Sequence, residues 1–273
     1  MVMLSSTQWE KINDIILYIN SEQDIYRLRK NFLNYVGELI PHDKSFFDLG
    51  TIKGTKVVFF DPVTENIGNE FMISYFKEYE STDTMFWFFS QHQEDIYRES
   101  NYITPAMLET SMFYTGWMAP QQIRYGMGAR VAKDSVLYGS INLWRSREKG
   151  DFTDEELEIL RVLNKHLSLF FFNKYPNGIK RNNENDYSET LIHLYNLTDR
   201  EAEVIDLIYQ GKSSKEIAEA LFISENTVKK HIYNIFKKMK VSSRSQMIKI
   251  VHGFLTTSVD DVSHRQLSDI QEV

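Results

Sequence analysis

The feature that most constrains the fold is a run of helix-start signals between residues 190 and 255. Three are capping boxes, in which a hydroxyl accepts a bond from a free backbone N–H and an acidic or amide side chain reaches back, and one is a single capping serine. They lie at Thr198–Glu201, Ser213–Glu216, Ser243–Gln246 and Ser224. Their spacing predicts four short helices joined by tight turns, with residues 213–222 and 225–240 forming a helix-turn-helix.

The segment 225–240 is amphipathic at helical spacing. Its apolar stripe consists of Val228, Ile232, Ile235, Phe236 and Met239. The opposite side carries amides, hydroxyls and cations: Asn226, Thr227, Lys230, Tyr233, Asn234 and Lys237, with Lys229 on the flank. Such groups can hydrogen-bond to guanine or adenine edges and neutralise phosphates. A helix with this surface is expected to lie in the major groove of duplex DNA, with its first turns facing the bases.

The positive charge is confined to this part of the chain. Residues 224–250 carry a formal charge of +6, while the rest of the chain carries −13. An acidic body that repels nucleic acid everywhere except at one basic face favours a single binding orientation. The alternative is a solvated lysine face on an ordinary helix; the caps, spacing and shared apolar core favour DNA binding over it.

The stretch LTDREAEVIDLIYQGKSSKEIAEALFISENTVKKHIYNIFKKMKVSSRSQMI closely resembles the DNA-binding domain of LuxR-type transcription regulators, over about residues 193–255. The resemblance implies that Lys229, Lys230 and Tyr233 face bases and that Thr227 and Lys238 contact the DNA backbone. Lys215 and Arg244 complete the expected DNA-binding set with the polar residues named above. The resemblance also implies a homodimer, with RNA polymerase as a further candidate partner.

The N-terminal part mixes helical and strand patterns. Apolar residues recur at helical spacing in 9–19, from Trp9, and in 28–39, before Pro41. Two strands are expected in 45–62, about a turn at Lys53–Gly54 and closed by Asp61–Pro62. A helix over 71–79 follows.

A second hairpin is expected in 123–146, turning at Lys133–Asp134–Ser135. Thr153 and Glu156 form a capping box that opens a helix over 153–172. Paired strands alternating with helices predict an α+β fold, with an antiparallel sheet, flanking helices and an all-α four-helix C-terminal domain.

Two phrases in this part, LIPHDKSFF and YGSINLWRSREKGDFTDEELEIL, resemble the GAF-like sensor domains of transcription regulators. The resemblance covers about residues 8–172, with an unrelated α+β domain as the alternative. The boundaries are therefore predicted as a GAF-like sensor or dimerisation domain at 1–172, a linker with Pro, Gly, several Asn and alternating charges at 173–189, the DNA-binding domain at 190–255 and an acidic tail at 256–273. The tail is either a frayed end or a segment that shields the lysine helix.

An aromatic cluster in residues 71–89 is the candidate input site. Tyr75 and Tyr79 fall on one helical face, and with Asp83, Trp87 and Trp117 they could bind a small apolar or amphipathic ligand. Two alternatives remain open. The rings fill the core, or the domain serves dimerisation or a protein partner, with helix 153–172 packing against a second copy.

Several other functions are disfavoured. The chain has no cysteine, so disulfides and thiolate metal sites are excluded. GKSS at 211–214 lacks the first glycine of a phosphate loop, since Asp206 stands there, and Gly211 is expected to end a helix instead. No catalytic constellation, metal-ligand spacing, cofactor motif, signal peptide or membrane span is found, so a cytoplasmic protein that is not an enzyme is expected. The rival is an enzyme or a signalling-nucleotide or small-molecule binder with an accessory DNA-binding domain.

Overall fold

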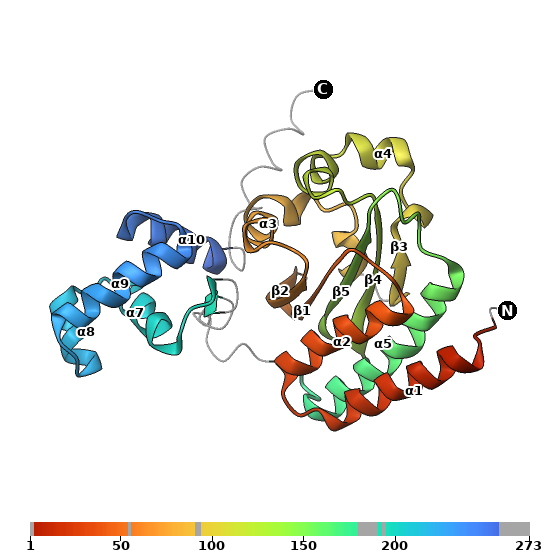
Figure 1. Ribbon diagram of the computed structural model, residues 1–273, viewed down its shortest axis with the longest axis horizontal. Coiled ribbons are helices and arrows are strands. Elements are labelled where there is room, and N and C mark those ends of the chain that lie inside the picture. The colour runs from red at the N-terminus through yellow and green to blue at the C-terminus, as the bar shows by residue number, and fades with distance from the viewer. Residues whose placement is uncertain (1–2, 54–55, 91–93, 180–190, 193–194, 257–273) are drawn as a thin grey trace. The chain divides into compact units, whose positions relative to one another are not determined.

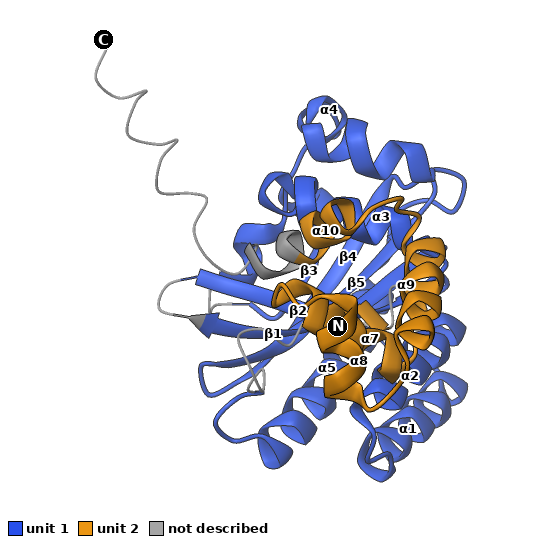
Figure 2. Ribbon diagram, turned by 90° about the vertical axis from the view of Figure 1, so that its left-hand side faces the viewer, with its two compact units in different colours: residues 1–180 blue, residues 181–273 orange. Residues whose placement is uncertain are grey.

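The computed structural model describes residues 3–53, 56–90, 94–179, 191–192 and 195–256 (Figure 1). The chain divides into two compact units, residues 1–180 and 181–273, which are coloured separately in Figure 2. Most of the expected linker (180–189) and nearly all of the expected tail (257–273) lie outside the described residues.

Unit 1 is built on one five-stranded antiparallel sheet with the strand order β2-β1-β5-β4-β3. Its elements are α1 (Ser6–Ser21), α2 (Ile25–Leu39), β1 (Lys44–Lys53), β2 (Lys56–Glu65), α3 (Asn69–Ser74), β3 (Ile96–Arg98), α4 (Pro105–Thr110), β4 (Tyr125–Lys133), β5 (Val136–Arg145) and α5 (Asp154–Lys174). The predicted fold class, an antiparallel sheet with flanking helices plus a helical C-terminal part, is confirmed.

The two faces of the sheet are covered differently (Figure 1). Helices α1, α2 and α5 cover one face, and their apolar residues share one core with alternate strand residues such as Phe47, Met127 and Ile141. The other face carries the residues in between, including Phe46 and Trp144, and is covered by residues from 69–90 and 99–121. This second layer is irregular: α3 and α4 are short, and π-helical turns occupy Tyr75–Tyr79 and Tyr114–Met118. Because side chains alternate along a strand, one set of strand residues packs against α1, α2 and α5, and the other set faces the irregular layer.

The two hairpins differ in how far the sequence predicts them. The turn between β4 and β5 is confirmed, because Lys133 pairs with Val136 and both Asp134 and Ser135 have positive φ, as a tight hairpin turn requires. The expected end of the second strand at Asp61–Pro62 is wrong, since β2 continues to Glu65. The ladder skips these two residues in a β-bulge with φ of +50° at Asp61, which accommodates a proline that cannot donate to the ladder.

Two further details differ from the sequence expectations. Strand β3 was not expected, because three residues within an irregular aromatic region carry no readable period. Trp9 begins the expected apolar stripe of α1 but is 49% exposed, while Ile12, Ile15 and Ile19 are buried.

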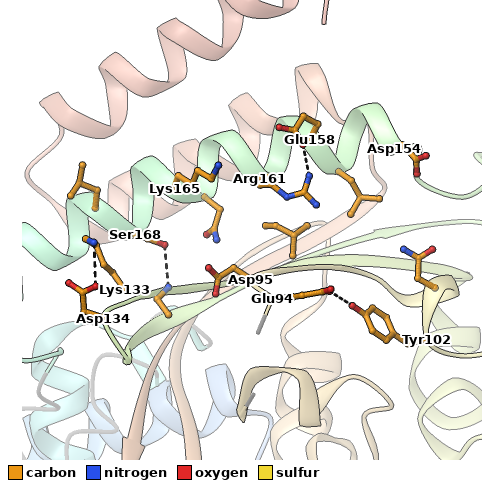
Figure 3. Close-up of a pocket in the computed structure, with 16 residues that line it drawn as sticks. Glu94, Asp95, Tyr102, Lys133, Asp134, Asp154, Glu158, Arg161, Lys165 and Ser168 are labelled. Carbon is orange, nitrogen blue, oxygen red and sulfur yellow. Dashed lines mark hydrogen bonds and ion pairs between the residues drawn. The ribbon is translucent and has the colours of Figure 1, made fainter. Parts of the chain in front are cut away.

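Side chains of α5 hydrogen-bond to the part of the β4 edge that extends beyond the short strand β3. Asn164 donates from Nδ2 to the carbonyl oxygen of Arg130 at 3.0 Å, and the backbone N–H of Ala132 donates to Oγ of Ser168 at 3.2 Å. These side chains satisfy part of the β4 edge that no strand pairs. Beside them lies a groove of about 990 Å³, in which charged residues of α5, among them Arg161 and Lys165, face the start of β3 and the end of β4 (Figure 3).

Unit 2 contains the four expected helices: α7 (Asp199–Tyr209), α8 (Ser214–Leu221), α9 (Glu225–Met239) and α10 (Arg244–Thr256). Complete capping boxes open α7 at Thr198 and α8 at Ser213, and Gly211 has a φ of +82° after α7. At α10 the reciprocal bond shifts by one residue, because the Gln246 side chain accepts from the backbone N–H of Ser242. Among the helices that the structure describes, none combines the length and apolarity that a membrane span requires.

Candidate functional sites

A three-residue turn fixes the start of α9 against α8. Phe222 ends α8 in the left-handed region with φ of +55°, and the N–H of Ile223 donates to the carbonyl of Ala218 at 3.0 Å. Ser224 then caps α9 by accepting from the N–H of Thr227 at 3.1 Å. The short, fully bonded turn gives the helix-turn-helix a defined geometry rather than a flexible hinge.

Helix α9 separates its apolar and polar sides as the sequence predicts. Val228, Ile235 and Met239 are buried, and Tyr233 on the opposite side is 67% exposed. The other predicted contact residues on this helix are exposed (Asn226, Lys229, Lys230, Lys237) or half-buried (Thr227, Asn234). The structure therefore brings these residues of α9 to the side of the helix opposite its buried stripe, where a nucleic acid can reach them.

Lys238 is placed differently from its neighbours on α9. Its Nζ donates to Oε2 of Glu201 on α7 at 2.6 Å, and the same oxygen accepts from the backbone N–H of Thr198 at 2.9 Å. Burial opposes ionisation of the Glu201 carboxyl, yet the bonds from Lys238 and Thr198 outweigh it and hold the pKa of Glu201 below its usual value. Lys238, expected to contact the DNA backbone, thus joins α9 to α7 in this structure.

We expect Glu201→Gln to lower the free energy of unfolding of unit 2 by about 1–3 kcal/mol near neutral pH, because a buried charge-assisted hydrogen bond is weakened. A depressed carboxyl pKa adds stability above the unfolded pKa of Glu, about 4.3, and that stability is lost as the pH falls through the lower folded pKa. The gap between wild type and variant, followed by urea titration with helical circular dichroism, should therefore close as the pH falls below about 4. Glu203→Gln, an exposed neighbour on α7, is the control, and an equal effect of both changes would contradict a special role for Glu201.

The two predicted contact residues outside α9 also differ from each other. Lys215 is exposed on α8, where it is accessible to a phosphate. Arg244, at the start of α10, donates to Oγ of Ser214 at 2.8 Å and to the carbonyl of Lys212 at 3.3 Å. Arg244 therefore ties α10 to the start of α8 as well as adding charge there.

Three of the five predicted ligand residues lie close together in unit 1. The hydroxyl of Tyr75 donates to Asp83 at 2.8 Å, and the rings of Tyr75 and Trp117 lie 5.3 Å apart. Tyr79 packs on the backbone at Gly116, where an added Cβ would come within 2.5 Å of its ring. Trp87 does not join them: it is 50% exposed, and its ring lies against Phe88 and Tyr102.

The structure also reveals residues that the sequence did not mark. Glu201 was read only as a cap, although its burial makes it the partner of Lys238. Asp48, Glu80 and Glu99 converge near Asp83 on the irregular side of the sheet, and all four carboxyl groups have raised pKa values because burial penalises their charged forms. An acidic residue at an inward position of a strand, such as Asp48, was the one signal available. Within the described residues, no group of three or more His, Asp or Glu side chains is arranged to hold a metal ion.

Comparison with known proteins agrees with this geometry. The profile of a family described as "Bacterial regulatory proteins, luxR family" matches residues 195–251. The spore germination protein GerE of Bacillus subtilis is 54% identical over 52 residues, which make up 19% of this chain and 70% of GerE. The CsgBAC operon transcriptional regulatory protein of Escherichia coli is also 54% identical over 52 residues, but these cover 24% of that protein, so the chain matches about a quarter of the length of such relatives.

Among solved structures, that of SdiA in complex with octanoyl-rac-glycerol matches with a TM-score of 0.51 and 14% identity, over 92% of this chain and 97% of the other. This match concerns the fold. A GAF domain from an Acinetobacter phosphoenolpyruvate-protein phosphotransferase aligns over 64% of this chain, with a TM-score of 0.45 and 13% identity. The helix-turn-helix geometry of unit 2, the family profile and the identity to GerE lead to one conclusion: the chain belongs to the luxR family of bacterial regulatory proteins.

Proposed function

We propose that this protein is a sequence-specific DNA-binding regulator of transcription in the cytoplasm, and that α9 lies in the major groove. The observation that carries the proposal is the exposed face of α9, where lysines, amides and Tyr233 lie opposite a buried apolar stripe. Lys229, Lys230 and Tyr233 are proposed to face bases, with Asn226 and Asn234 beside them. Lys237, Lys215 and Thr227 are proposed to position the helix on the phosphates. The name of the Escherichia coli relative, a transcriptional regulatory protein, supports this function.

Unit 1 is proposed to act as the input of the regulator. A signal bound there would change the spacing or release of two DNA-binding domains by shifting a population of conformations. As a homodimer the protein would read two half-sites about one helical turn apart. RNA polymerase is a further proposed partner once the protein is on DNA.

The signal is proposed to be a small molecule that contacts Tyr75, Asp83 and Trp117. These residues already share a hydrogen bond and a ring contact in the layer over the irregular face of the sheet. SdiA, the fold neighbour, was solved with octanoyl-rac-glycerol, which supplies a neutral probe for this layer. The rival function, an enzyme or nucleotide binder with an accessory DNA-binding domain, predicts substrate turnover that does not depend on DNA.

Replacing Lys230 with alanine is the test of the groove assignment. We expect binding to the best duplex site, found by in vitro selection, to weaken by about 1–3 kcal/mol, with relaxed discrimination at one base position. Gel-shift titrations at several salt concentrations measure both effects. Lys249 is an exposed lysine on α10 outside the proposed set, so Lys249→Ala should lower the affinity for DNA far less. Wild-type affinity and discrimination for Lys230→Ala at every salt concentration would show that α9 does not read the groove.

A further inference from the structure

Four carboxyl side chains meet on the irregular side of the sheet in unit 1. Asp48, on β1, accepts at Oδ1 from both the N–H (2.9 Å) and the hydroxyl (2.6 Å) of Ser140 on β5. Asp83 accepts from the hydroxyl of Tyr75 and from the N–H of Met85, both at 2.8 Å. Glu99 accepts at Oε1 from the Thr84 hydroxyl at 2.8 Å. Glu80 completes the group through its electrostatic interactions with Asp48 and Asp83, and the donors to the other three carboxyl groups are neutral.

Glu99 is the member whose bonding is incomplete. Its side chain is almost entirely buried, with 4% of the residue exposed, yet Oε2 has no hydrogen-bond partner within the described part of the chain. This oxygen lies over the backbone of β4, where a Cβ built on Gly126 would come within 3.1 Å of it and within 3.4 Å of the Trp144 indole nitrogen. A buried acceptor without a donor is costly, and such an atom usually marks a missing partner.

In the part of the chain that the structure describes, none of the four carboxyl groups forms an ion pair. The nearest arginines are engaged elsewhere: Arg29 with Asp61, and Arg124 with Glu109 at 3.1 Å. Burial accordingly raises the pKa of Asp48 and of Glu80 to about 8, that of Glu99 to about 7 and that of Asp83 to about 6. The cluster is therefore complementary to a positive charge, and among the described residues Arg29 and Arg124 act on it only from a distance, without an ion pair.

Aromatic rings border the same cluster. Trp117 lies 5.3 Å from Tyr75 and 5.1 Å from Trp144, and Trp144 lies 5.1 Å from Phe46. The faces of such rings attract organic cations. Metal-ligand geometry is not found among the described acidic and histidine side chains, which disfavours a bare metal ion as the missing charge.

The four carboxyl groups differ in burial. Glu80 and Asp83 keep partial contact with solvent, whereas Asp48 and Glu99 are buried.

We propose that unit 1 binds an organic ammonium ion between the sheet and residues 69–90 and 99–121, with Asp83 and Glu99 as its anionic partners and Trp117 and Trp144 as its aromatic wall. The inference rests on the proposed sensing function and names the chemical class of the signal. It differs from the neutral ligand seen in the fold neighbour.

Such binding is linked to pH. At pH 6, Asp48, Glu80 and Glu99 are mostly protonated and Asp83 is about half protonated, so a cation must displace protons in order to bind; at pH 8 more of these groups are already ionised. Affinity should therefore rise with pH over this range. The other ionisable groups near the cluster are Tyr75 and Tyr97, whose pKa values burial raises, together with Arg29, Arg124 and Asp151. The tyrosines stay neutral across this range, so they do not reverse the trend.

The experiment uses the full-length chain and matched probes. Phenethylamine, choline and spermidine are compared with neutral 2-phenylethanol and octanoyl-rac-glycerol by thermal shift, and the strongest binder is titrated by calorimetry at pH 6, 7 and 8. We expect at least one ammonium probe to bind, more tightly at pH 8 than at pH 6, and 2-phenylethanol not to bind. Glu99→Gln should lower the affinity for that probe by about 10–100-fold, because one charge-assisted hydrogen bond is lost.

Glu99→Gln distinguishes a residue that binds the ligand from one that only stabilises the fold, because its expected effects on melting temperature and on affinity have opposite signs. Glu99→Gln removes an uncompensated buried charge, so the unliganded variant should melt at a higher temperature than wild type at pH 8 while binding the probe less tightly. Glu78→Gln, exposed in the same segment, should change neither property. Stabilisation by octanoyl-rac-glycerol without any response to the three ammonium probes would overturn the inference and leave sensing intact. No response to any of the five probes would overturn both.

Discussion

Gly139→Ala is expected to destabilise unit 1 by more than about 4 kcal/mol, among the largest effects of a single substitution. A Cβ on Gly139 would lie 2.0 Å from the carbonyl oxygen of Asp48 and 3.2 Å from Cα of Leu49. These are backbone atoms of the neighbouring strand β1, which the ladder with β5 holds in place through the pairs Asp48–Ser140 and Leu49–Gly139. Relief of the clash must therefore separate two central strands.

Tryptophan fluorescence reports this unfolding without a signal from unit 2, because all four tryptophans, Trp9, Trp87, Trp117 and Trp144, lie in unit 1. Guanidinium titration followed by tryptophan emission measures the change. Gly68→Ala is the matched control: its added Cβ would make only ordinary contacts of 3.7 Å or more. That change should alter stability by about 0.5 kcal/mol or less. Equal midpoints for the two variants would contradict a close approach of β1 and β5 at Gly139.

Arg29→Met is expected to lower the free energy of unfolding of unit 1 by about 3–5 kcal/mol, because it removes the cation that pairs with the buried carboxylate of Asp61. Arg29 is fully buried on α2 and forms an ion pair with Asp61 at the bulge of β2. Its guanidinium also donates to the carbonyls of Asp61, Phe47 (3.3 Å) and Ile25 (3.1 Å). One side chain therefore fastens α2 to both strands of the first hairpin.

The same fluorescence titration tests this prediction, with a substitution at Arg27 on α2 as the control. Arg27 is exposed and pairs with Asp24 at 3.7 Å, so Arg27→Met should cost about 0.5 kcal/mol or less. Arg29→Lys should fall between the two, since a lysine keeps the charge but lacks the planar fork of donors. A loss of less than about 1 kcal/mol for Arg29→Met would mean that the bulge does not depend on this pair.

Both changes act on β1, the strand that carries Asp48 of the carboxyl cluster. Asp48 lies on β1 directly opposite Ser140, one residue beyond Gly139. A ligand response lost through either variant would therefore follow from the lost fold. Glu99→Gln is the sharper probe of ligand binding, because its effects on stability and on affinity have opposite signs.

The sequence predicted the helices of unit 2 because the signals for them are local. A capping hydroxyl and its partner three residues later specify a helix start without reference to the rest of the chain. The apolar period of α9 likewise identifies its buried side within fifteen residues. The turn at Asp134–Ser135 and the start of α5 were predicted for the same reason. The set of DNA-facing residues follows from this local pattern and remains a prediction for binding experiments.

Tertiary structure decided what depends on residues distant in the chain. Lys238 forms an ion pair with Glu201, which lies 37 residues earlier in the chain and is brought beside it by the packing of α7 against α9. Asp48, Glu80, Asp83 and Glu99 converge because antiparallel pairing and the layer of residues 69–90 and 99–121 bring them together, whereas Trp87, only four residues from Asp83, points elsewhere. Hydrophobic period and capping chemistry act over a few residues and are readable from the sequence. Burial, and with it the pairing and pKa of charged groups, is a property of the packed chain, since the surroundings that remove a side chain from water are assembled only by the fold.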